Sequence, residues 1–548
     1  MAGRSDTHEV FNQSPPYQDV DLFGDDRALQ DAVAANWAKG EITALSSFGR
    51  HWGSAAMFEQ ARLANDNPPR LRTFDSKGNR RDIVEFHPAY HHFMTESIGA
   101  GLHASTWRPN GTLAALPAEV ARAARFYMVA QVENGHMCPI TMTRASVAAL
   151  TIEPALLGTL MPKILSRTYD PQFRPWSEKS GMTLGMGMTE KQGGTDVRAN
   201  TTRAEPAGDF YRITGHKWFM SAPMCDAFLV LAQAPGGLTC FFMPRFRPDG
   251  SVNALQFQRL KDKLGNRSNA SSEVEFQDAF ALRVGDEGRG VRTILSMVQL
   301  TRLDCAIASA GMMRAALAHA VHHCRHRSVF GKRLADQPIM RAVLADMAIE
   351  VEGTLAVVMR LCRSFDCAAT LILDAARTRL LTPAVKYWVC KTAPALVYEA
   401  MECLGGNGYV EDDTLARLYR EAPVNAIWEG SGNVMCLDVL RVLNRDGDEV
   451  RAVLDGLARE AGDLPGVADA VKFIGKTMAD AEAEVDARAV VERLAHLAAV
   501  AALNTTTPEV AERFARTRLG ERRGATFGTA KLSNADTAML LGRALPEA

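Results

Sequence analysis

The sequence predicts a mainly helical α+β protein, and three observations support this fold class. Residues 31–180 are rich in alanine and carry helical patterning broken by proline and glycine. Residues 210–282 contain short β-branched and aromatic runs separated by turn residues. An apolar stripe at alternating spacings of four and three then resumes after Gly290. Because 548 residues exceed what one hydrophobic core holds, several domains are expected.

The composition is that of an ordinary globular protein. The formal net charge is −1, so the whole-chain charge points neither to nucleic acid nor to a membrane surface. No apolar run approaches the roughly 20 residues of a membrane span, and the polar N-terminus lacks a signal-peptide core. Ten cysteines without any C-x-x-C spacing predict reduced thiols and a cytoplasmic location.

Changes in composition and in hydrophobic pattern along the chain predict four structural domains. Residues 1–182 combine an irregular, acidic N-terminal arm of about 30 residues with a helical domain that includes 118–131 and 139–150. Residues 183–286 form a β domain, with short antiparallel strands expected at 211–215, 227–232, 238–243 and 272–276.

The remaining two units are helical. Residues 287–445 form a four-helix domain with expected helices near 338–366 and 370–404. Its first helix carries the stripe Ala306, Ala310, Met313, Leu317, Ala320 and Cys324. Residues 446–548 are alanine-rich and charged, with a break at 505–508, and are expected to form an extra helical tail domain.

One segment at the start of the β domain has the composition of a cofactor loop. It runs Met-Thr-Glu-Lys-Gln-Gly-Gly-Thr-Asp over residues 188–196. Thr189 and Thr195 supply hydroxyls, and Gly193 and Gly194 allow the backbone to approach a ligand closely. The alternative is an ordinary glycine turn entering a strand, and this segment alone does not separate the two.

A second segment, Ile-Trp-Glu-Gly-Ser-Gly-Asn at 427–433, places Glu429 beside glycine in an apolar stretch. A carboxylate next to Trp428 in such a setting is expected to have a raised pKa, which suits a base that acts near neutral pH. The alternative is a structural carboxylate that caps or pairs locally.

Together and in this order, the motifs resemble those of the acyl-CoA dehydrogenase family. The cofactor loop is followed by Ile-Thr-Gly-His-Lys-Trp-Phe-Met-Ser at 213–221, then by Arg-Ser-Val-Phe-Gly at 327–331 with Gln337. Leu-Gly-Gly-Asn-Gly-Tyr at 404–409 and Trp-Glu-Gly-Ser at 428–431 complete the set. The resemblance covers about residues 80–445. It is closest to AidB-type adaptive-response flavoproteins, on the length, the tail and the phrases at 215–219, 419–425 and 427–438.

The resemblance implies the acyl-CoA dehydrogenase fold, bound FAD, an acyl-CoA or similar thioester as substrate, and a homotetramer. Glu429 is the implied catalytic base, which removes the α-proton while the β-hydrogen leaves as hydride to flavin N5. Arg302 and Trp428 are the implied substrate contacts. The implied cofactor contacts are Met186, Thr189, Gly193, Gly194, Thr195, Met220, Ser221, Ala222, Arg327, Phe330, Gln337, Ile427, Trp428, Gly430, Ser431, Gly432 and Asn433.

Some of these roles have simpler alternatives. Arg327, Phe330 and Gln337 resemble residues that reach the cofactor of a neighbouring subunit, and the alternative is ordinary helix-end charge and packing. For Arg302 the alternative is a solvated residue at a helix start.

Three positions depart from the family pattern. Trp428 stands where tyrosine is usual, Phe219 where tryptophan often covers the flavin, and Glu402 where glutamine is common. The first two leave the acyl group open, with a short branched chain such as isovaleryl favoured. The third makes a cofactor contact at Glu402 doubtful.

A second function, from another class, is DNA binding in the alkylation response with residual dehydrogenation. From Asp446 onward the tail has 13 lysines and arginines against 17 acidic residues, which does not favour phosphate binding. Five arginines nevertheless cluster there, and the alternative is a solvated or paired face: Arg513, Arg516, Arg518, Arg522 and Arg523. Histidine pairs such as His319/His323 lack accompanying carboxylates, so no metal site is expected.

Overall fold

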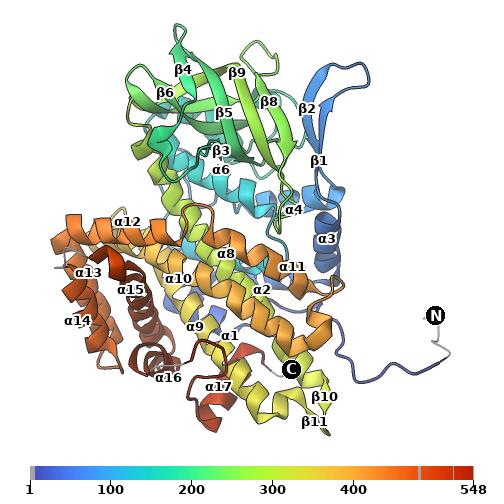
Figure 1. The fold of residues 1–548 in the computed structure, drawn as a ribbon, viewed down its shortest axis with the longest axis vertical. Helices are drawn as coiled ribbons and strands as arrows, with labels where there is room; N and C mark the ends of the chain where they lie inside the picture. Colours follow the sequence, from blue (N-terminus) through green and yellow to red (C-terminus); the bar gives the residue numbers. More distant parts are fainter. Residues whose placement is uncertain (1–6, 479–482, 522–523, 547–548) are drawn as a thin grey trace.

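A computed structural model describes residues 7–478, 483–521 and 524–546 and shows a helical body with a β domain at one end (Figure 1). The fold class is mainly helical α+β, as the sequence predicts. Within the described ranges, no helix combines the length and the apolar character that crossing a membrane would require.

The N-terminal helices form the first part of the body. Asp26 begins the first of them, because its carboxylate accepts a hydrogen bond from the Leu29 N–H. The helices are α1 (Arg27–Ala35), α2 (Ile42–Trp52), α3 (Ala55–Asp66), α4 (Pro88–Gly99), α5 (Ala118–Ala130), α6 (Met137–Leu150) and α7 (Pro154–Ile164).

A β-hairpin interrupts this helical region, and the sequence prediction missed it. Strands β1 (Arg70–Phe74) and β2 (Arg80–Glu85) pair antiparallel, and Asp82 and Val84 of β2 are buried. The Asp82 carboxylate accepts a hydrogen bond from the N–H of Phe257 in the β domain. The hairpin therefore belongs structurally with the β domain, and its strands are too short to give a clear pattern of their own.

The β domain is a barrel. All four predicted runs fall within strands, and β6 pairs with β7 to close the sheet order β6-β4-β5-β9-β7. The four predicted strands pair antiparallel with one another, as expected. Two strands that were not predicted, β3 and β4, add parallel pairings to β6. The strands are β3 (Leu184–Gly187), β4 (Arg203–Pro206), β5 (Tyr211–Ser221), β6 (Ala227–Ala234), β7 (Gly237–Pro244), β8 (Leu255–Leu260) and β9 (Ser271–Val284).

The long helix α8 (Gly290–His326) connects the barrel to the helical body. Its predicted apolar stripe from Ala306 to Cys324 is buried throughout. It packs against α9 (Pro338–Cys367) and α10 (Ile372–Leu404), and α10 packs against α12 (Gly432–Arg445). The shorter α11 (Thr414–Glu421) and the small hairpin β10 (Ser328–Val329) with β11 (Lys332–Arg333) complete this part.

A buried ion-pair network fixes α8 relative to the N-terminal helices. Asp304 on α8 accepts two hydrogen bonds from Arg122 of α5, at 2.6 and 2.7 Å, and one from Arg144 of α6 at 3.2 Å. Arg144 also pairs with Glu119. Because opposite charges balance inside the core, the network holds three helices in one arrangement close to Thr301.

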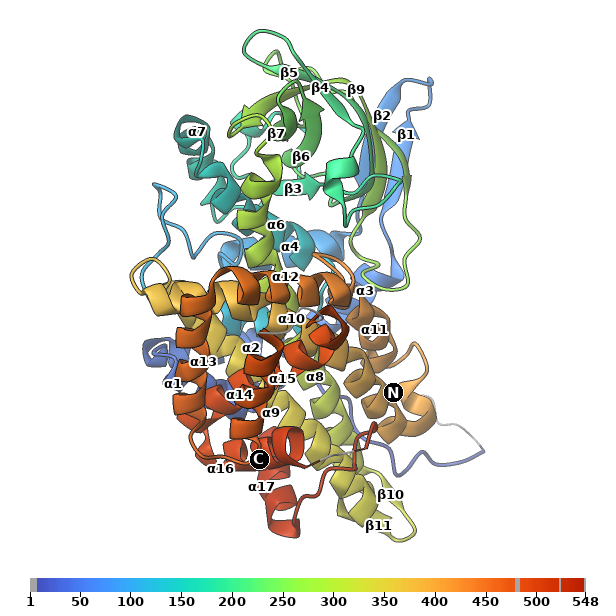
Figure 2. The same cartoon turned by 60° about the vertical axis from the view of Figure 1, so that its left-hand side comes forward.

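The tail helices lie against the four-helix domain rather than apart from it (Figure 2). They share one hydrophobic core with it, since Leu494 of the tail and Leu355 of α9 belong to the same buried cluster. Arg518 strengthens this contact through ion pairs with Asp346 at 2.7 Å and Glu350 at 2.6 Å on α9. The tail helices are α13 (Gly447–Ala461), α14 (Val467–Met478), α15 (Ala483–Thr506), α16 (Pro508–Phe514) and α17 (Asn534–Ala544).

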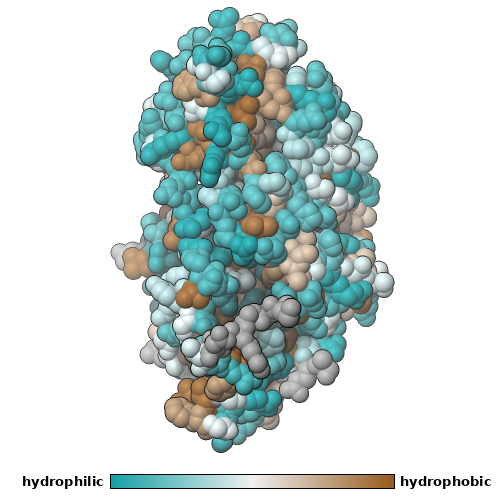
Figure 3. Space-filling view, turned by 90° about the vertical axis from the view of Figure 1, so that its right-hand side faces the viewer, coloured by the Kyte–Doolittle hydropathy of each residue, from teal (hydrophilic) through white to brown (hydrophobic). Residues whose placement is uncertain are grey.

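The molecular surface is mainly hydrophilic. Figure 3 shows apolar residues on one face as separate small patches rather than as one continuous area. All ten cysteines are buried and free. The interior, rather than the surface, therefore carries most of the apolar residues.

Candidate active site

The expected base, Glu429, lies in a tight turn just before α12. Its backbone φ is 57°, in the left-handed region that residues with a Cβ rarely adopt, and Gly430 follows with a φ of 98°. The turn brings the side chain against α8, where the Thr301 hydroxyl donates a 2.6 Å hydrogen bond to Oε2 of Glu429.

The surroundings of Glu429 act on its pKa in two directions. Burial raises the pKa above its ordinary value of 4.5, and it is the largest effect. The hydrogen bond from Thr301 and the positive charges of Lys386 and Arg302 act in the opposite direction. The net shift is upward, as the sequence predicts, and a carboxylate of this kind is suited to remove a proton near neutral pH.

Arg302, the expected substrate arginine, is buried beside the base. Its Nε donates to the carbonyl oxygen of Glu429 at 3.1 Å, and its guanidinium pairs with Asp438 of α12 at 2.5 Å. The alternative of a solvated helix-start residue is wrong, because the residue lies inside α8 and is only 4% exposed.

The predicted cofactor loop connects β3 with β4. A bridge pairs Glu190 with Gly193, whose φ is 129°. Gly194 packs against Thr189, and a Cβ at Gly194 would come within 2.3 Å of the Thr189 hydroxyl. The carbonyl of Thr189 accepts a hydrogen bond from the Trp218 N–H at 2.8 Å. The two glycines therefore permit a compact loop that is attached to β5.

A buried ion pair holds this loop, and the sequence prediction did not identify it. Glu190 lies 2.8 Å from the ammonium group of Lys217 on β5, and both side chains are fully buried. The Glu190 carboxylate also accepts hydrogen bonds from the N–H groups of Thr201 and Thr202. These bonds keep the Glu190 carboxyl ionised and hold its pKa well below the ordinary range, although burial alone would raise it.

The second predicted hydroxyl segment lies at the end of β5. Met220 is buried, and the Ser221 hydroxyl lies 3.0 Å from the Ser271 hydroxyl on β9. Ala222 has a φ of 50° and donates its N–H to Ala270 at 2.8 Å. The strand therefore ends in a bend that leaves Ser221 at the edge of the barrel.

Cys138, at the start of α6, connects the two halves of the predicted site. Burial raises the pKa of its thiol to about 12; Lys263, Asn269 and Ser221 oppose this shift, and the charge of Glu429 adds to it. Trp428, the residue before the base, packs against the hydrophobic cluster that contains both Cys138 and Met220 of β5. The turn of the base and the end of β5 therefore border the same core.

Both halves carry exposed apolar side chains of the kind that a flavin ring packs against. Phe219 of β5 is 49% exposed, and Ile427, two residues before the base, is 66% exposed. The hydroxyls of Thr189 and Ser221 offer hydrogen bonds to polar ring atoms or phosphates. This set of donors and apolar groups meets the needs of a large, partly polar cofactor.

The segments on both sides of the base are also ordered by neighbours. The Trp428 indole N–H donates to Asn425 at 2.9 Å. Ser431 and Gly432 begin α12, and the Asn433 side-chain oxygen accepts two hydrogen bonds from Arg488, at 2.9 and 2.7 Å. Arg488 belongs to α15 of the tail, and nothing in the sequence near Asn433 indicates this contact.

Three expected cofactor residues lie elsewhere in this chain. Arg327, Phe330 and Gln337 surround the β10–β11 hairpin, at the end of the body away from the barrel (Figure 1). Arg327 donates to the Asn12 carbonyl at 2.8 Å, and Gln337 donates to the Val329 carbonyl at 3.2 Å. Phe330 is fully exposed with a φ of 51°. These residues do not join Glu429 within one chain.

Two of the departures from the family pattern have local partners. Phe219 lies 4.7 Å from the ammonium group of Lys261, measured to the ring centre. Glu402 accepts a hydrogen bond from the Tyr398 hydroxyl at 2.9 Å on the surface of α10. Neither contact involves the base.

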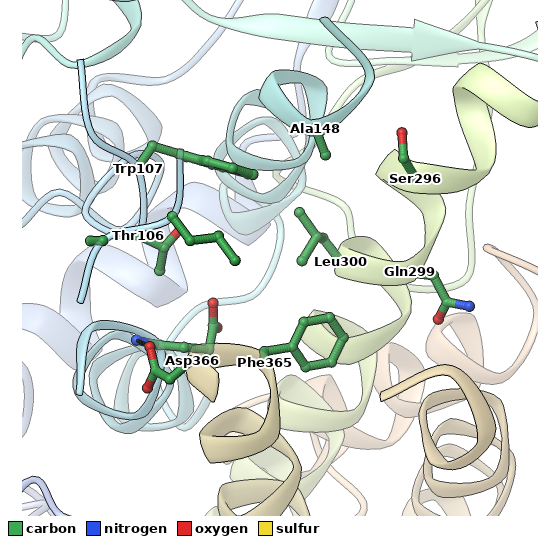
Figure 4. A pocket seen from close by; sticks show the side chains of 11 residues that line it. Thr106, Trp107, Ala148, Ser296, Gln299, Leu300, Phe365 and Asp366 are labelled. Atoms are coloured by element: carbon green, nitrogen blue, oxygen red, sulfur yellow. Dashed lines mark hydrogen bonds between the residues drawn. The ribbon is translucent and has the colours of Figure 1, made fainter. Parts of the chain in front are cut away.

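A separate pocket of about 200 Å³ lies between α6, α8 and the end of α9 (Figure 4). Trp107, Leu300 and Phe365 supply apolar walls, and Asp366 lies at its edge. Burial raises the pKa of Asp366 to about 7. The pocket contains none of the expected cofactor or substrate residues, so it is distinct from the site around Glu429.

The expected DNA-contacting arginines are engaged with protein. Arg518 is buried in its pairs with α9, so the expectation of a phosphate contact there is wrong. Arg513 and Arg516 share Asp536, at 2.7 and 3.2 Å. Arg522 and Arg523 lie outside the described residues. Duplex-DNA binding stays a prediction without support from this cluster.

The histidine pairs also have protein partners. His322 bonds the Pro15 carbonyl at 2.8 Å, and His323 bonds the Ser14 hydroxyl at 3.0 Å, both in the N-terminal arm. Within residues 7–478, 483–521 and 524–546, no group of three or more potential ligands is arranged to hold a metal ion.

Comparison with known proteins agrees with this geometry. Residues 12–171 match the model described as adaptive response protein AidB N-terminal domain, 185–279 match the acyl-CoA dehydrogenase middle domain, and 288–444 match its C-terminal domain. The chain is 52% identical to the putative acyl-CoA dehydrogenase AidB of Escherichia coli (strain K12) over 441 residues, which is 80% of this chain and 81% of that protein.

Acyl-CoA dehydrogenase family member 11 of Caenorhabditis elegans is 31% identical over 451 residues, 78% of this chain and 70% of that protein. The crystal structure of Caenorhabditis elegans ACDH-11 in complex with C11-CoA superposes with a TM-score of 0.83 at 27% identity, covering 95% and 96% of the two chains. The acyl-CoA dehydrogenase of Bacillus anthracis complexed with FAD shares the fold, with a TM-score of 0.66 at 16% identity over 83% and 86%. This chain therefore belongs to the acyl-CoA dehydrogenase family and carries an N-terminal domain of the AidB type.

Proposed function

We propose that this flavoprotein dehydrogenates the α,β bond of an acyl-CoA thioester, with Glu429 as the base. The observation that carries the proposal is the placement of Glu429 in a left-handed turn, with its carboxylate bonded to Thr301 and its neighbour Trp428 packed against the cluster that contains Met220 of the barrel. A carboxylate held next to the barrel edge is in position to remove the α-proton of a bound thioester.

The reaction removes one proton and one hydride from the substrate, and FAD is the one cofactor that it requires. The α-proton passes to Oε1 or Oε2 of Glu429, and the β-hydrogen with both bonding electrons is taken up by bound FAD, which supplies the redox chemistry. Thr189, the loop at 193–195 and Ser221 would hold the cofactor on the barrel side. The residues at 430–433 would meet it on the α12 side.

The substrate is proposed to be a short branched acyl-CoA. The solved complex of the Caenorhabditis elegans relative with C11-CoA supports a thioester ligand for this fold. The ring of Trp428, fixed by its bond to Asn425, is larger than the usual tyrosine and would reduce the space near the base. This favours a compact acyl group.

Product analysis tests the reaction. FAD-loaded protein is incubated with isovaleryl-CoA and an artificial electron acceptor, and the thioester is analysed by mass spectrometry. The proposal predicts a product that has lost two hydrogens, and it predicts none with Glu429→Gln. Unchanged thioester across a panel of short, branched and long acyl-CoAs would reject it.

We also propose that the β10–β11 hairpin contacts a neighbouring subunit in a homotetramer. Phe330 at its tip is fully exposed, and Ile339 at the start of α9 is 83% exposed. Large apolar side chains in such positions are typical of subunit contacts. In sedimentation, the wild-type protein should be a tetramer and Phe330→Asp should be a smaller species. A monomeric wild-type protein would contradict the proposal.

A further inference from the structure

Three consecutive backbone carbonyls around the base are held by two buried cations. The ammonium group of Lys386 on α10 donates to the Trp428 carbonyl at 2.7 Å and to the Gly430 carbonyl at 2.5 Å. Arg302 donates to the Glu429 carbonyl between them at 3.1 Å. Each peptide group of the turn at 428–430 is therefore tied to a helix of the rigid core.

The turn needs such support because its backbone is strained. A residue with a Cβ is disfavoured in the left-handed region, and Glu429 has a φ of 57°. If the turn relaxed to a negative φ, the Glu429 side chain would leave the direction of Thr301. Hydrogen bonds from a charged donor are stronger than those between neutral groups, so the bonds from Lys386 and Arg302 oppose this relaxation.

Lys386 is suited to this task by its environment. It is 1% exposed, so water does not screen its charge or compete for its donors. It projects from the middle of α10, a helix of 33 residues that packs against α8, α9 and α12. Its donors are therefore fixed relative to Thr301.

We propose that Lys386 is a positioning residue, which holds the turn at 428–430 in the conformation that presents the Glu429 carboxylate to the substrate. This inference rests on the proposed role of Glu429 as the base. Lys386 acts through the backbone of the turn and through its charge, rather than by contact with the reacting atoms.

Several groups face Glu429 besides Lys386, and they define what a variant should change. Thr301 and Arg302 of α8 bond Glu429 directly, and the thiols of Cys305 on α8 and Cys138 on α6 interact with its charge. The charge of Arg302 is offset by its 2.5 Å pair with Asp438 of α12. Lys386 differs from Arg302 in that both of its hydrogen bonds go to backbone carbonyls, whereas Arg302 also pairs with a carboxylate.

The variant Lys386→Met removes the donors and the charge. Infrared spectroscopy follows the band of the protonated Glu429 carboxyl group, and its pH dependence gives the pKa of Glu429. The band is assigned to Glu429 because it should be absent from Glu429→Gln. We expect the pKa to rise by about one unit, as loss of a nearby positive charge predicts. We also expect flavin bleaching by acyl-CoA to slow about 100-fold, with acyl-CoA affinity within about twofold of wild type, because the backbone clamp contributes mainly to orientation.

A matched control comes from the same helix. Arg377 is also a buried cation of α10, but it pairs with Glu460 of the tail. Arg377→Met should lower stability and leave the Glu429 band and the bleaching rate at wild-type values. If Lys386→Met folds poorly, Lys386→Arg provides a second test. It keeps the charge and the donors and should retain most of the wild-type bleaching rate.

The outcomes separate the two proposals. A shifted Glu429 band in Lys386→Met without any bleaching in wild type supports the positioning role and rejects the proposed reaction. The positioning role is overturned if the Glu429 pKa in Lys386→Met equals that of wild type. It is also overturned if Arg377→Met shifts this pKa as much as Lys386→Met does. Both outcomes apply whatever the reaction is. If Lys386→Arg is as slow as Lys386→Met, the clamp is also rejected.

Discussion

Thr301 donates a 2.6 Å hydrogen bond to Oε2 of Glu429, so the long helix that spans the barrel and the helical body also fixes the base. Asp304 lies one turn further along α8 and is held by Arg122 and Arg144. The orientation of the base therefore depends on the packing of the helices as well as on its own turn.

Loss of the Thr301 hydroxyl should slow the reaction. In Thr301→Val the hydrogen bond that lowers the Glu429 pKa is gone, so the pH midpoint of flavin bleaching should move upward. The rate should fall about tenfold, which corresponds to about 1.4 kcal/mol and lies near the lower limit for a hydrogen bond to a charged group. Thr301→Ser keeps the hydroxyl and is the control. Identical pH profiles for the valine and serine variants would contradict the prediction.

The base should destabilise the folded protein at neutral pH. The folded-state pKa of Glu429 lies above its ordinary value of 4.5. Its stabilising contribution is therefore fully present below pH 4.5 and is lost as the pH rises through the folded-state pKa. The glutamine in Glu429→Gln does not ionise. The free energy of unfolding of this variant minus that of wild type should therefore increase as the pH rises. Urea unfolding at a series of pH values measures this difference, and a gap that narrows with rising pH would refute the assignment.

The buried pair Glu190 and Lys217 should be essential to the cofactor loop. Glu190→Gln leaves the Lys217 ammonium group without its charged partner, which should cost about 3–5 kcal/mol of stability. The loop at 188–202 should loosen, and FAD should bind more weakly in a fluorescence titration. Lys191→Met, at an exposed neighbouring position, is the control and should leave both quantities unchanged. Wild-type FAD affinity in Glu190→Gln would show that the pair does not order the loop.

The tail should depend on Arg518 more than on its neighbours. Arg518→Met removes the buried positive charge between Asp346 and Glu350, and the expected loss is about 3–5 kcal/mol. Arg516 is partly exposed, so Arg516→Met should cost less than about 1 kcal/mol. Denaturant unfolding and limited proteolysis of the tail compare the two. Equal losses would mean that the buried pairs contribute no more than surface ones.

The sequence predicts the parts of the site that side-chain motifs carry. Glu429 and the loop at 188–196 are recognised because glycines, hydroxyls and a carboxylate occur at characteristic spacings. The apolar stripe of α8 is predicted because helical periodicity shows which face is buried. The roles of Glu429 and of this loop stay predictions.

The residues that support the site could not be predicted in the same way. Lys386 donates to backbone carbonyls 42 and 44 residues further along the chain. Because every residue has a backbone carbonyl, the sequence does not show which ones accept these bonds. Arg518 belongs to a basic cluster, and its acidic partners lie about 170 residues earlier on α9. Spacing within one segment does not reveal which distant carboxylate neutralises an arginine. The parallel pairing of β6 with β3 and β4 likewise joins segments that are separated along the chain.

Anaerobic mixing of the FAD-loaded protein with isovaleryl-CoA tests the central claim most directly. If Glu429 removes the α-proton, the visible absorbance of oxidised flavin should fall within one turnover in wild type and persist in Glu429→Gln at equal FAD occupancy. Bleaching that is equally fast in both proteins would contradict the role of Glu429. Persistent absorbance in wild type across short, branched and long acyl-CoAs would contradict the proposed reaction itself.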